Sequence, residues 1–177
     1  ALRYFNVAGA RFDGTLGQAT PKATHLIKAA CETALGKRDS LAIFGTDYDT
    51  PDGTCIRDYI HVEDLATAHL DALQYLADGG SSETLNCGYG RGYSVREVLA
   101  MVRSVSGVDF PIIETARRPG DAPQLIADNR RILEVLGWLP QHDELKEICR
   151  TAWEWERRYQ DGSPAATNSA TELGYTN

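Results

Sequence analysis

The sequence predicts an α/β fold. Short runs rich in β-forming residues, among them residues 2–8, 40–45 and 56–62, alternate with segments whose apolar residues recur every three or four positions. Hydrophobic residues make up 42% of the 177 residues and charged residues 24%, which is ordinary for a globular protein. A chain of this length can bury the core of one domain.

The first elements are a strand and a helix separated by a loop. Leu2–Ala8 is rich in β-formers and ends at Gly9, and the glycine- and proline-containing residues 10–22 indicate an irregular loop. We expect Thr24 to cap the next helix and Gly36 to end it. Its inward face would carry Leu26, Ile27, Ala30 and Ala34.

The central part predicts two strands and a long helix. Ser40–Gly45 forms a short apolar strand, and a turn at Asp52-Gly53 precedes a strand with Ile56, Tyr59, Ile60 and Val62. Asp64 stands just before an expected helix with a single apolar face. That face would carry Leu65, Ala68, His69, Ala72, Leu73 and Leu76.

The remaining elements follow in the same alternation. Strands are expected at Thr84–Cys87 and Phe110–Glu114, with a helix between them whose start has the Ser94/Glu97 capping-box pattern. Its buried face would carry Val95, Val98, Leu99, Val102 and Val105. Asp128 would cap a short helix ending at Gly137, and a last amphipathic helix covers about residues 143–159. Residues 161–177 lack periodicity and are expected to be a disordered tail.

Glycines at 88, 90 and 92 resemble a dinucleotide-binding fingerprint but do not match it. Their spacing is Gly-x-Gly-x-Gly, whereas the fingerprint is Gly-x-Gly-x-x-Gly after a first strand. We therefore do not interpret this segment as a dinucleotide-binding loop.

Arginines offer the best candidate ligand-binding groups. Arg57 stands at the start of a strand beside a turn, and its planar guanidinium fork matches the oxygens of a phosphate. An ion pair of Arg57 with Asp58 or Asp64 is the alternative. The loop Arg117-Arg118-Pro119-Gly120-Asp121 could clamp a diphosphate with little loss of conformational entropy.

Composition excludes several classes of function. The formal net charge of -7 argues against nucleic-acid binding through a broad basic surface, and no apolar run reaches 18 residues, so no membrane span is expected. The four scattered cysteines predict reduced thiols, as in a cytoplasmic protein, and no metal site. The chain begins in what resembles mid-strand, without an initiator methionine or signal peptide, which suggests a piece of a longer protein.

Six motifs in register resemble the C-terminal half of the UDP-glucose 4-epimerases, NAD-dependent members of the extended short-chain dehydrogenase/reductase superfamily. They run in order from Leu2 to about Trp155. The motifs are Leu2–Asn6, Ser40–Gly45, Thr50–Thr54, Arg57–Val62, Leu85–Gly88 and Arg117–Asp121.

The resemblance implies a specific architecture and set of contacts. Residues 1–160 would hold the last strands of a Rossmann-like sheet and the small substrate-binding domain, with residues 1–10 and 54–90 completing the parallel sheet of an N-terminal domain. Phe5 would lie near the nicotinamide, and Asn6 would bind the nucleotide-sugar. The other matching substrate positions are His25 and Leu26 beside the uridine, Phe44 at the uracil, Arg57 and Arg118 at the diphosphate, Tyr59 in the same strand as Arg57, Asp121 at the ribose, and Leu125 at the sugar.

The resemblance also implies a reaction and partners. The family removes a hydride from C4 of UDP-glucose or UDP-galactose with NAD and returns it to the other face of a 4-keto sugar, usually as a homodimer and in galactose metabolism. The required cofactor fingerprint and Tyr-x-x-x-Lys pair are missing here: none of the eight tyrosines has lysine four positions later. We therefore expect no catalytic residue in this chain and no activity from it alone. The alternatives are a related enzyme (pentose epimerase, dehydratase or decarboxylase) or a standalone UDP-sugar-binding pseudoenzyme.

Overall fold

A computed structural model describes residues 1–20 and 22–160 of the chain. The predicted tail, residues 161–177, lies outside these described residues. The α/β fold is confirmed: five helices and eight short strands alternate, and most strand pairs are parallel. No helix in this described part is long and apolar enough to span a membrane.

The first strand of the sequence divides between two sheets. β1 (Leu2–Tyr4) pairs in parallel with β5 (Leu85–Cys87), and β2 (Asn6–Ala8) pairs in parallel with β4 (Ile56–His61). The second sheet continues with β6 (Gly92–Ser94), antiparallel to β4, and with β8 (Gln124–Leu125), parallel to β4. β4, which carries Arg57, Asp58 and Tyr59, is therefore the central strand of this sheet.

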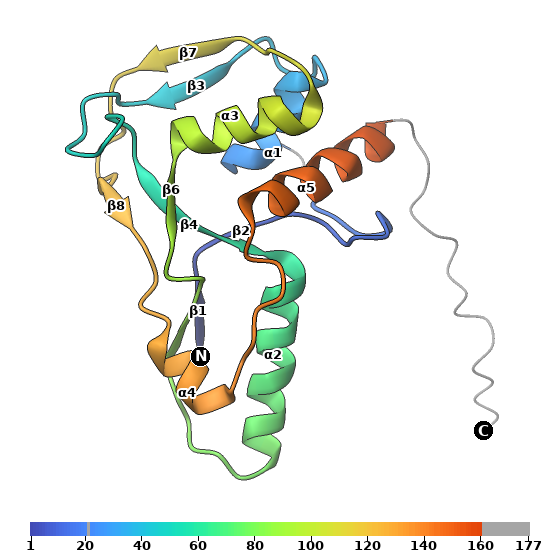
Figure 1. The fold of residues 1–177 in the computed structure, drawn as a ribbon, viewed down its shortest axis with the longest axis vertical. Coiled ribbons are helices and arrows are strands. Elements are labelled where there is room, and N and C mark those ends of the chain that lie inside the picture. Colours follow the sequence, from blue (N-terminus) through green and yellow to red (C-terminus); the bar gives the residue numbers. More distant parts are fainter. Residues whose placement is uncertain (21, 161–177) are drawn as a thin grey trace, which may run out of the picture.

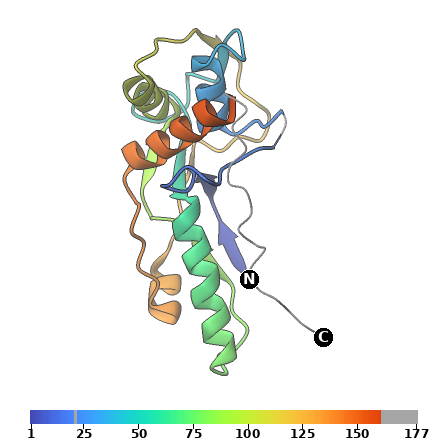
Figure 2. The same ribbon diagram turned by 90° about the vertical axis from the view of Figure 1, so that its right-hand side faces the viewer.

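A separate two-stranded sheet lies at one end of the molecule. β3 (Leu41–Phe44) and β7 (Ile112–Thr115) pair in parallel there, and α1 (Leu26–Ala34) and α3 (Val95–Ser106) lie next to them (Figure 1). α5 (Leu145–Gln160) packs against both helices, as the view at right angles also shows (Figure 2). The apolar side chains of these three helices form the larger of two cores.

The smaller core lies at the other end, below β4 in Figure 1. α2 (Val62–Ala77) and α4 (Arg130–Leu136) enclose it with β5, and Trp138 is its largest buried side chain. Tyr89 contacts both cores, and its hydroxyl donates to the buried carboxylate of Asp64 at 2.6 Å. The two ends are thus joined by apolar packing and by a buried polar network.

Of the three N-terminal helix caps predicted from the sequence for α1, α3 and α4, the structure confirms one. The predicted capping box of α3 is confirmed: Ser94 accepts from the backbone N–H of Glu97, and the Glu97 side chain accepts from that of Ser94. The predicted caps Thr24 and Asp128 are wrong by one residue, since α1 begins after His25 and α4 after Asn129. Asp128 instead pairs with Arg130 on the surface.

The single apolar face predicted for α2 is also wrong. Asp64 does not precede this helix but lies inside it, because His61 is the N-cap and accepts from the backbone N–H of Glu63. Leu65 and Ala68 are buried, whereas Leu73 and Leu76 are exposed. Val62, Leu70, Leu73 and Leu76 form a second apolar stripe on this helix, which we call the α2 stripe. Its side chains are 37–65% exposed.

Candidate functional site

A cavity of about 710 Å³ opens between β2, β4, α1 and the loops that follow β3 and β7. It runs along the whole of β2, from Phe5 to Gly9, and past Arg57 and Tyr59 of β4. The structure brings nine of the ten residues singled out in the sequence to its wall. They are Phe5, Asn6, His25, Leu26, Phe44, Arg57, Tyr59, Arg118 and Asp121.

The tenth residue, Leu125, lies beside the cavity. β8 pairs with β4 so that Leu125 stands opposite Arg57, and its side chain is 51% exposed. The pairing is fixed at its start by the backbone N–H of Ile56, which donates to the carbonyl of Pro123 at 2.8 Å. Leu125 is therefore positioned by the strand that carries Arg57.

Arg57 has a different partner from those expected. Its guanidinium reaches the carboxylate of Asp121 at 3.4 Å, and it is only 14% exposed. The alternative pairs with Asp58 and Asp64 are wrong, because both carboxylates are buried and accept from other groups. A distance of 3.4 Å is long for a charge-assisted bond, so this pair leaves Arg57 with donors to offer an anion.

The two arginines of the 117–118 pair point to different partners. The guanidinium of Arg118 stacks over the ring of Phe44, 3.7 Å from its centroid, inside the cavity. Arg117 lies outside it, bonded to Asp47 at 2.7 Å and stacked on Tyr48. The bond to Arg117 lowers the pKa of the Asp47 carboxyl. Of these two arginines, only Arg118 therefore lines the cavity.

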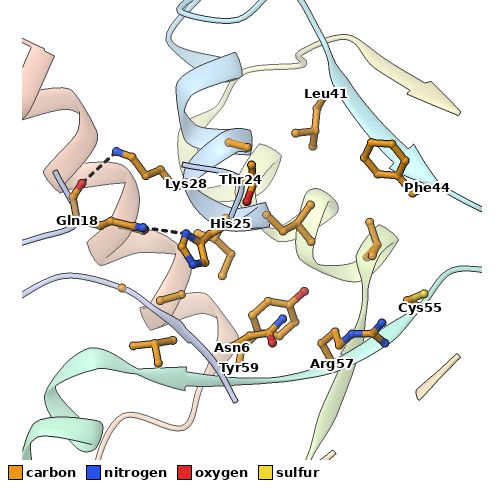
Figure 3. A pocket seen from close by; sticks show the side chains of 18 of the residues that line it. Asn6, Gln18, Thr24, His25, Lys28, Leu41, Phe44, Cys55, Arg57 and Tyr59 are labelled. Carbon is orange, nitrogen blue, oxygen red and sulfur yellow. Dashed lines mark hydrogen bonds between the residues drawn. The ribbon is translucent and has the colours of Figure 1, made fainter. Parts of the chain in front are cut away.

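Two polar side chains, those of Asn6 and Tyr59, line the cavity. Asn6 and Tyr59 stand opposite each other in the β2–β4 register, between the arginine end and the His25 end of the cavity (Figure 3). Tyr59 is almost fully buried, and that burial raises the pKa of its phenol. Tyr59 therefore stays neutral at physiological pH and offers a phenol hydroxyl on the cavity wall.

The loop that follows β2 (residues 9–20), which we call the roof loop, lines the cavity through Gly9 and Gln18 and is hydrogen-bonded to α5. Thr151 Oγ1 accepts from the backbone N–H of Ala10 at 3.2 Å, and Trp155 Nε1 donates to the carbonyl of Gln18 at 3.1 Å. Arg158 donates to the carbonyl of Asp13 at 2.7 Å. A Cβ on residue 17 would lie 2.3 Å from the Trp155 ring, so only glycine permits this close approach.

Sequence reasoning missed several polar residues on the wall, among them Gln18, Lys28 and Cys55. Gln18 lies in the loop that matched no family motif, and the thiol of Cys55 stands in the turn before Arg57. The spacing of Lys28 and Glu32 on one helix face predicts a surface ion pair, but Lys28 is buried and also pairs with Glu156. Within the described residues, no group of three or more potential ligand side chains could hold a metal ion.

The buried pair Asp58 and Asp64 orders the loops around β4. Asp58 accepts from the backbone N–H groups of Tyr89, Gly90 and Ala127 at 2.9–3.2 Å. Burial raises the pKa of Asp58, while the three N–H donors pull it down. Asp64 accepts from the backbone of Gln141 and His142 at 2.9 Å. Both carboxylates therefore support the site without facing the cavity.

Comparison with known proteins points to an epimerase family. Residues 1–88 match the model of the NAD dependent epimerase/dehydratase family. The chain is 60% identical over 173 residues to a UDP-glucose 4-epimerase of Azospirillum brasilense, covering 95% of this chain and 50% of that protein. A UDP-glucose 4-epimerase of Rhizobium leguminosarum is 50% identical and is covered to 48%. The chain thus spans about half the length of these curated relatives.

Solved structures show the same relation. The UDP-glucose 4-epimerase of Stenotrophomonas maltophila with bound NAD and formylated UDP-arabinopyranose superimposes with a TM-score of 0.87 at 39% identity, covering 92% of this chain and 48% of that one. The enzyme of Bifidobacterium longum in complex with NAD+ and UDP gives a TM-score of 0.81 at 34% identity, with 91% and 48% covered.

Proposed function

The chain belongs to the NAD dependent epimerase/dehydratase family, and from this premise we propose that it forms the nucleotide-sugar-binding part of a UDP-glucose 4-epimerase. The observation that carries the proposal is the convergence of two arginines, an aromatic ring and a carboxylate on one cavity. These are Arg57, Arg118, Phe44 and Asp121.

The chemistry of this wall matches a uridine diphosphate. Arg57 and Arg118 would neutralise the diphosphate, each through charge-assisted hydrogen bonds of about 1.5–3 kcal/mol. Phe44, with Arg118 stacked on one of its faces, offers further apolar surface to the base, and Asp121 is an acceptor for ribose hydroxyls. Local pairing of this kind needs no positive net charge, which agrees with a chain of formal charge -7.

The residues of this chain do not fit a complete NAD site. Phe5 is the one residue assigned to the cofactor, and the glycine fingerprint and Tyr-x-x-x-Lys pair are missing from the sequence. We therefore assign this chain binding and orientation of the nucleotide-sugar, and no step of hydride transfer. The chain alone would be inactive.

Exposed apolar surface supports a second part that completes the fold. The α2 stripe has Leu70 and Leu73 each 65% exposed, and Tyr4 of β1, 56% exposed, lies next to His69 of α2. Monomeric proteins rarely leave such a contiguous stripe uncovered. We propose that a dinucleotide-binding part of the same protein covers it, adding strands beside β1 and a layer against α2.

UDP binding by the purified protein tests the binding role. Arg57→Ala should weaken UDP binding about 10- to 150-fold, the equivalent of about 1.5–3 kcal/mol. Arg117→Ala is the matched control, since Arg117 stands beside Arg118 but contacts Asp47 outside the cavity. Equal losses in both variants, or no loss in Arg57→Ala, would show that this cavity does not bind the diphosphate.

Product analysis tests the reaction class. With UDP-glucose and UDP-xylose as separate substrates, a hexose 4-epimerase forms UDP-galactose, whereas pentose epimerases, dehydratases and decarboxylases give other products. The isolated 177-residue chain should form no product. Turnover by this chain alone would refute the proposal that it binds the nucleotide-sugar but carries out no step of hydride transfer. UDP binding without any turnover by the protein at its natural length would favour the pseudoenzyme.

A further inference from the structure

Gln18 holds the imidazole of His25 at the edge of the cavity. The amide nitrogen of Gln18 lies 2.8 Å from Nδ1 of His25, and both side chains stand on the cavity wall (Figure 3). An amide N–H can only donate, so Nδ1 must accept and cannot carry a hydrogen. In the neutral ring the hydrogen is therefore on Nε2.

The backbone of Gln18 is itself fixed by two buried donors. Its carbonyl accepts from Lys28 Nζ at 3.0 Å and from Trp155 Nε1 at 3.1 Å. Lys28 is 6% exposed and forms ion pairs with Glu156 and with Glu32. One donor comes from α1 and the other from α5. These two helices therefore fix the position of the Gln18 backbone, from which the side chain extends.

From these contacts we propose that Gln18 is a positioning residue, which fixes the tautomer and orientation of His25 so that its Nε2–H is a hydrogen-bond donor for the nucleotide-sugar. No described residue accepts a hydrogen bond from Nε2 of His25, whereas Nδ1 is occupied by Gln18. The role in binding rests on the function proposed above, while the fixed tautomer does not.

The tautomer is tested without any ligand. Long-range ¹H–¹⁵N spectra of the protein labelled with ¹⁵N-histidine distinguish the Nε2–H from the Nδ1–H form, and the His25 signals are identified by their loss in His25→Asn. Wild-type His25 should show the Nε2–H form, and Gln18→Ala a mixture. Gln18→Glu places an acceptor at Nδ1 and should yield the Nδ1–H or charged form. An unchanged tautomer in both variants would overturn the proposal.

Binding is tested by a double-mutant cycle with UDP as the probe. Gln18→Ala and His25→Ala should each weaken UDP binding about two- to tenfold, the range for one net hydrogen bond. If Gln18 acts through His25, the double variant binds UDP no more weakly than His25→Ala alone. Losses that multiply in the double variant would overturn the positioning role.

A control variant and the wild-type binding result show whether the role of Gln18 or the proposed UDP binding has failed. Gln141→Ala removes an exposed glutamine side chain that reaches only the carbonyls of Leu139 and Pro140, and it should change neither readout. If wild-type protein binds no UDP, the proposed function fails, and the NMR result still decides whether Gln18 fixes the tautomer of His25.

Discussion

Replacing Asp58 tests how much of the support around β4 depends on one buried carboxylate. Asp58 is completely buried, and its Oδ2 accepts from the backbone of Gly90 at 2.9 Å and Ala127 at 3.2 Å. Its Oδ1 accepts from the backbone of Tyr89 at 3.0 Å. A carboxylate is suited to this position because it has acceptors on both oxygens and no donor that would oppose an N–H.

The geometry gives different magnitudes for two substitutions. Asp58→Ala leaves three N–H groups without their acceptor, and at about 1–3 kcal/mol for each, with the lower value for the two partly buried ones, the loss is about 3–5 kcal/mol. Asp58→Asn can keep the two bonds at the Oδ2 position and turns its NH₂ toward Tyr89. It should therefore lose about 1–3 kcal/mol.

Urea unfolding of the purified protein measures both losses. With an m-value of about 2 kcal/mol/M, the midpoint for Asp58→Ala should fall by about 2 M, and that for Asp58→Asn by about half as much. Asp128→Asn is the matched control, since this exposed carboxylate bonds only the side chain and the backbone N–H of Arg130, and the asparagine oxygen can still accept from that N–H; its midpoint should hardly move. Equal losses for Asn and Ala at position 58 would refute the reasoning from acceptor count.

Two further predictions concern buried charge. Lys28→Met leaves Glu156 buried without its main partner and should cost about 3–5 kcal/mol in the free energy of unfolding, while Lys28→Arg should recover most of it; equal stability of Met and wild type in thermal unfolding would contradict this. Burial lowers the pKa of His61 to about 4, so the unfolded state, with a pKa of 6.5, binds the proton first as pH falls. Stability should therefore drop by about 2 kcal/mol between pH 6.5 and pH 5, and His61→Gln should remove that part of the slope; an unchanged slope in His61→Gln would contradict it.

Local signals predicted the local parts of the fold. The Ser94/Glu97 capping box succeeded because both partners lie within one turn of helix. Thr24 and Asp128 failed as caps because a neighbouring residue took the position, and neither sequence pattern distinguishes adjacent candidates.

Periodicity could not tell which apolar residues of α2 face the core. Leu65 and Ala68 are buried while Leu73 and Leu76 are exposed, although all four fit one helical repeat. A helix covered on two sides carries two apolar stripes, and the sequence alone does not say which surface lies against each. The prediction merged them into one face.

Residues of the candidate site could be predicted only where they belong to a sequence motif. Arg118 and Phe44 were identified from separate motifs, and the structure places them in stacking contact. The contacts that position the charged side chains around the cavity join residues far apart in the sequence. Arg57 pairs with Asp121, 64 positions away, and Lys28 pairs with Glu156, 128 positions away. No spacing rule connects such residues, so the alternative pairs of Arg57 with Asp58 or Asp64 were wrong and Lys28 was missed.

The bonds between the roof loop and α5 have a consequence for synthesis of the protein on the ribosome. Ala10, Gln18 and Asp13 meet their partners 141, 137 and 145 positions later. The loop therefore cannot take its final conformation until α5 has left the exit tunnel, many seconds after β2 at about 5–20 residues per second. Contacts of such wide separation also slow folding. The newly made chain would thus pass through a period in which its strands exist and its pocket does not.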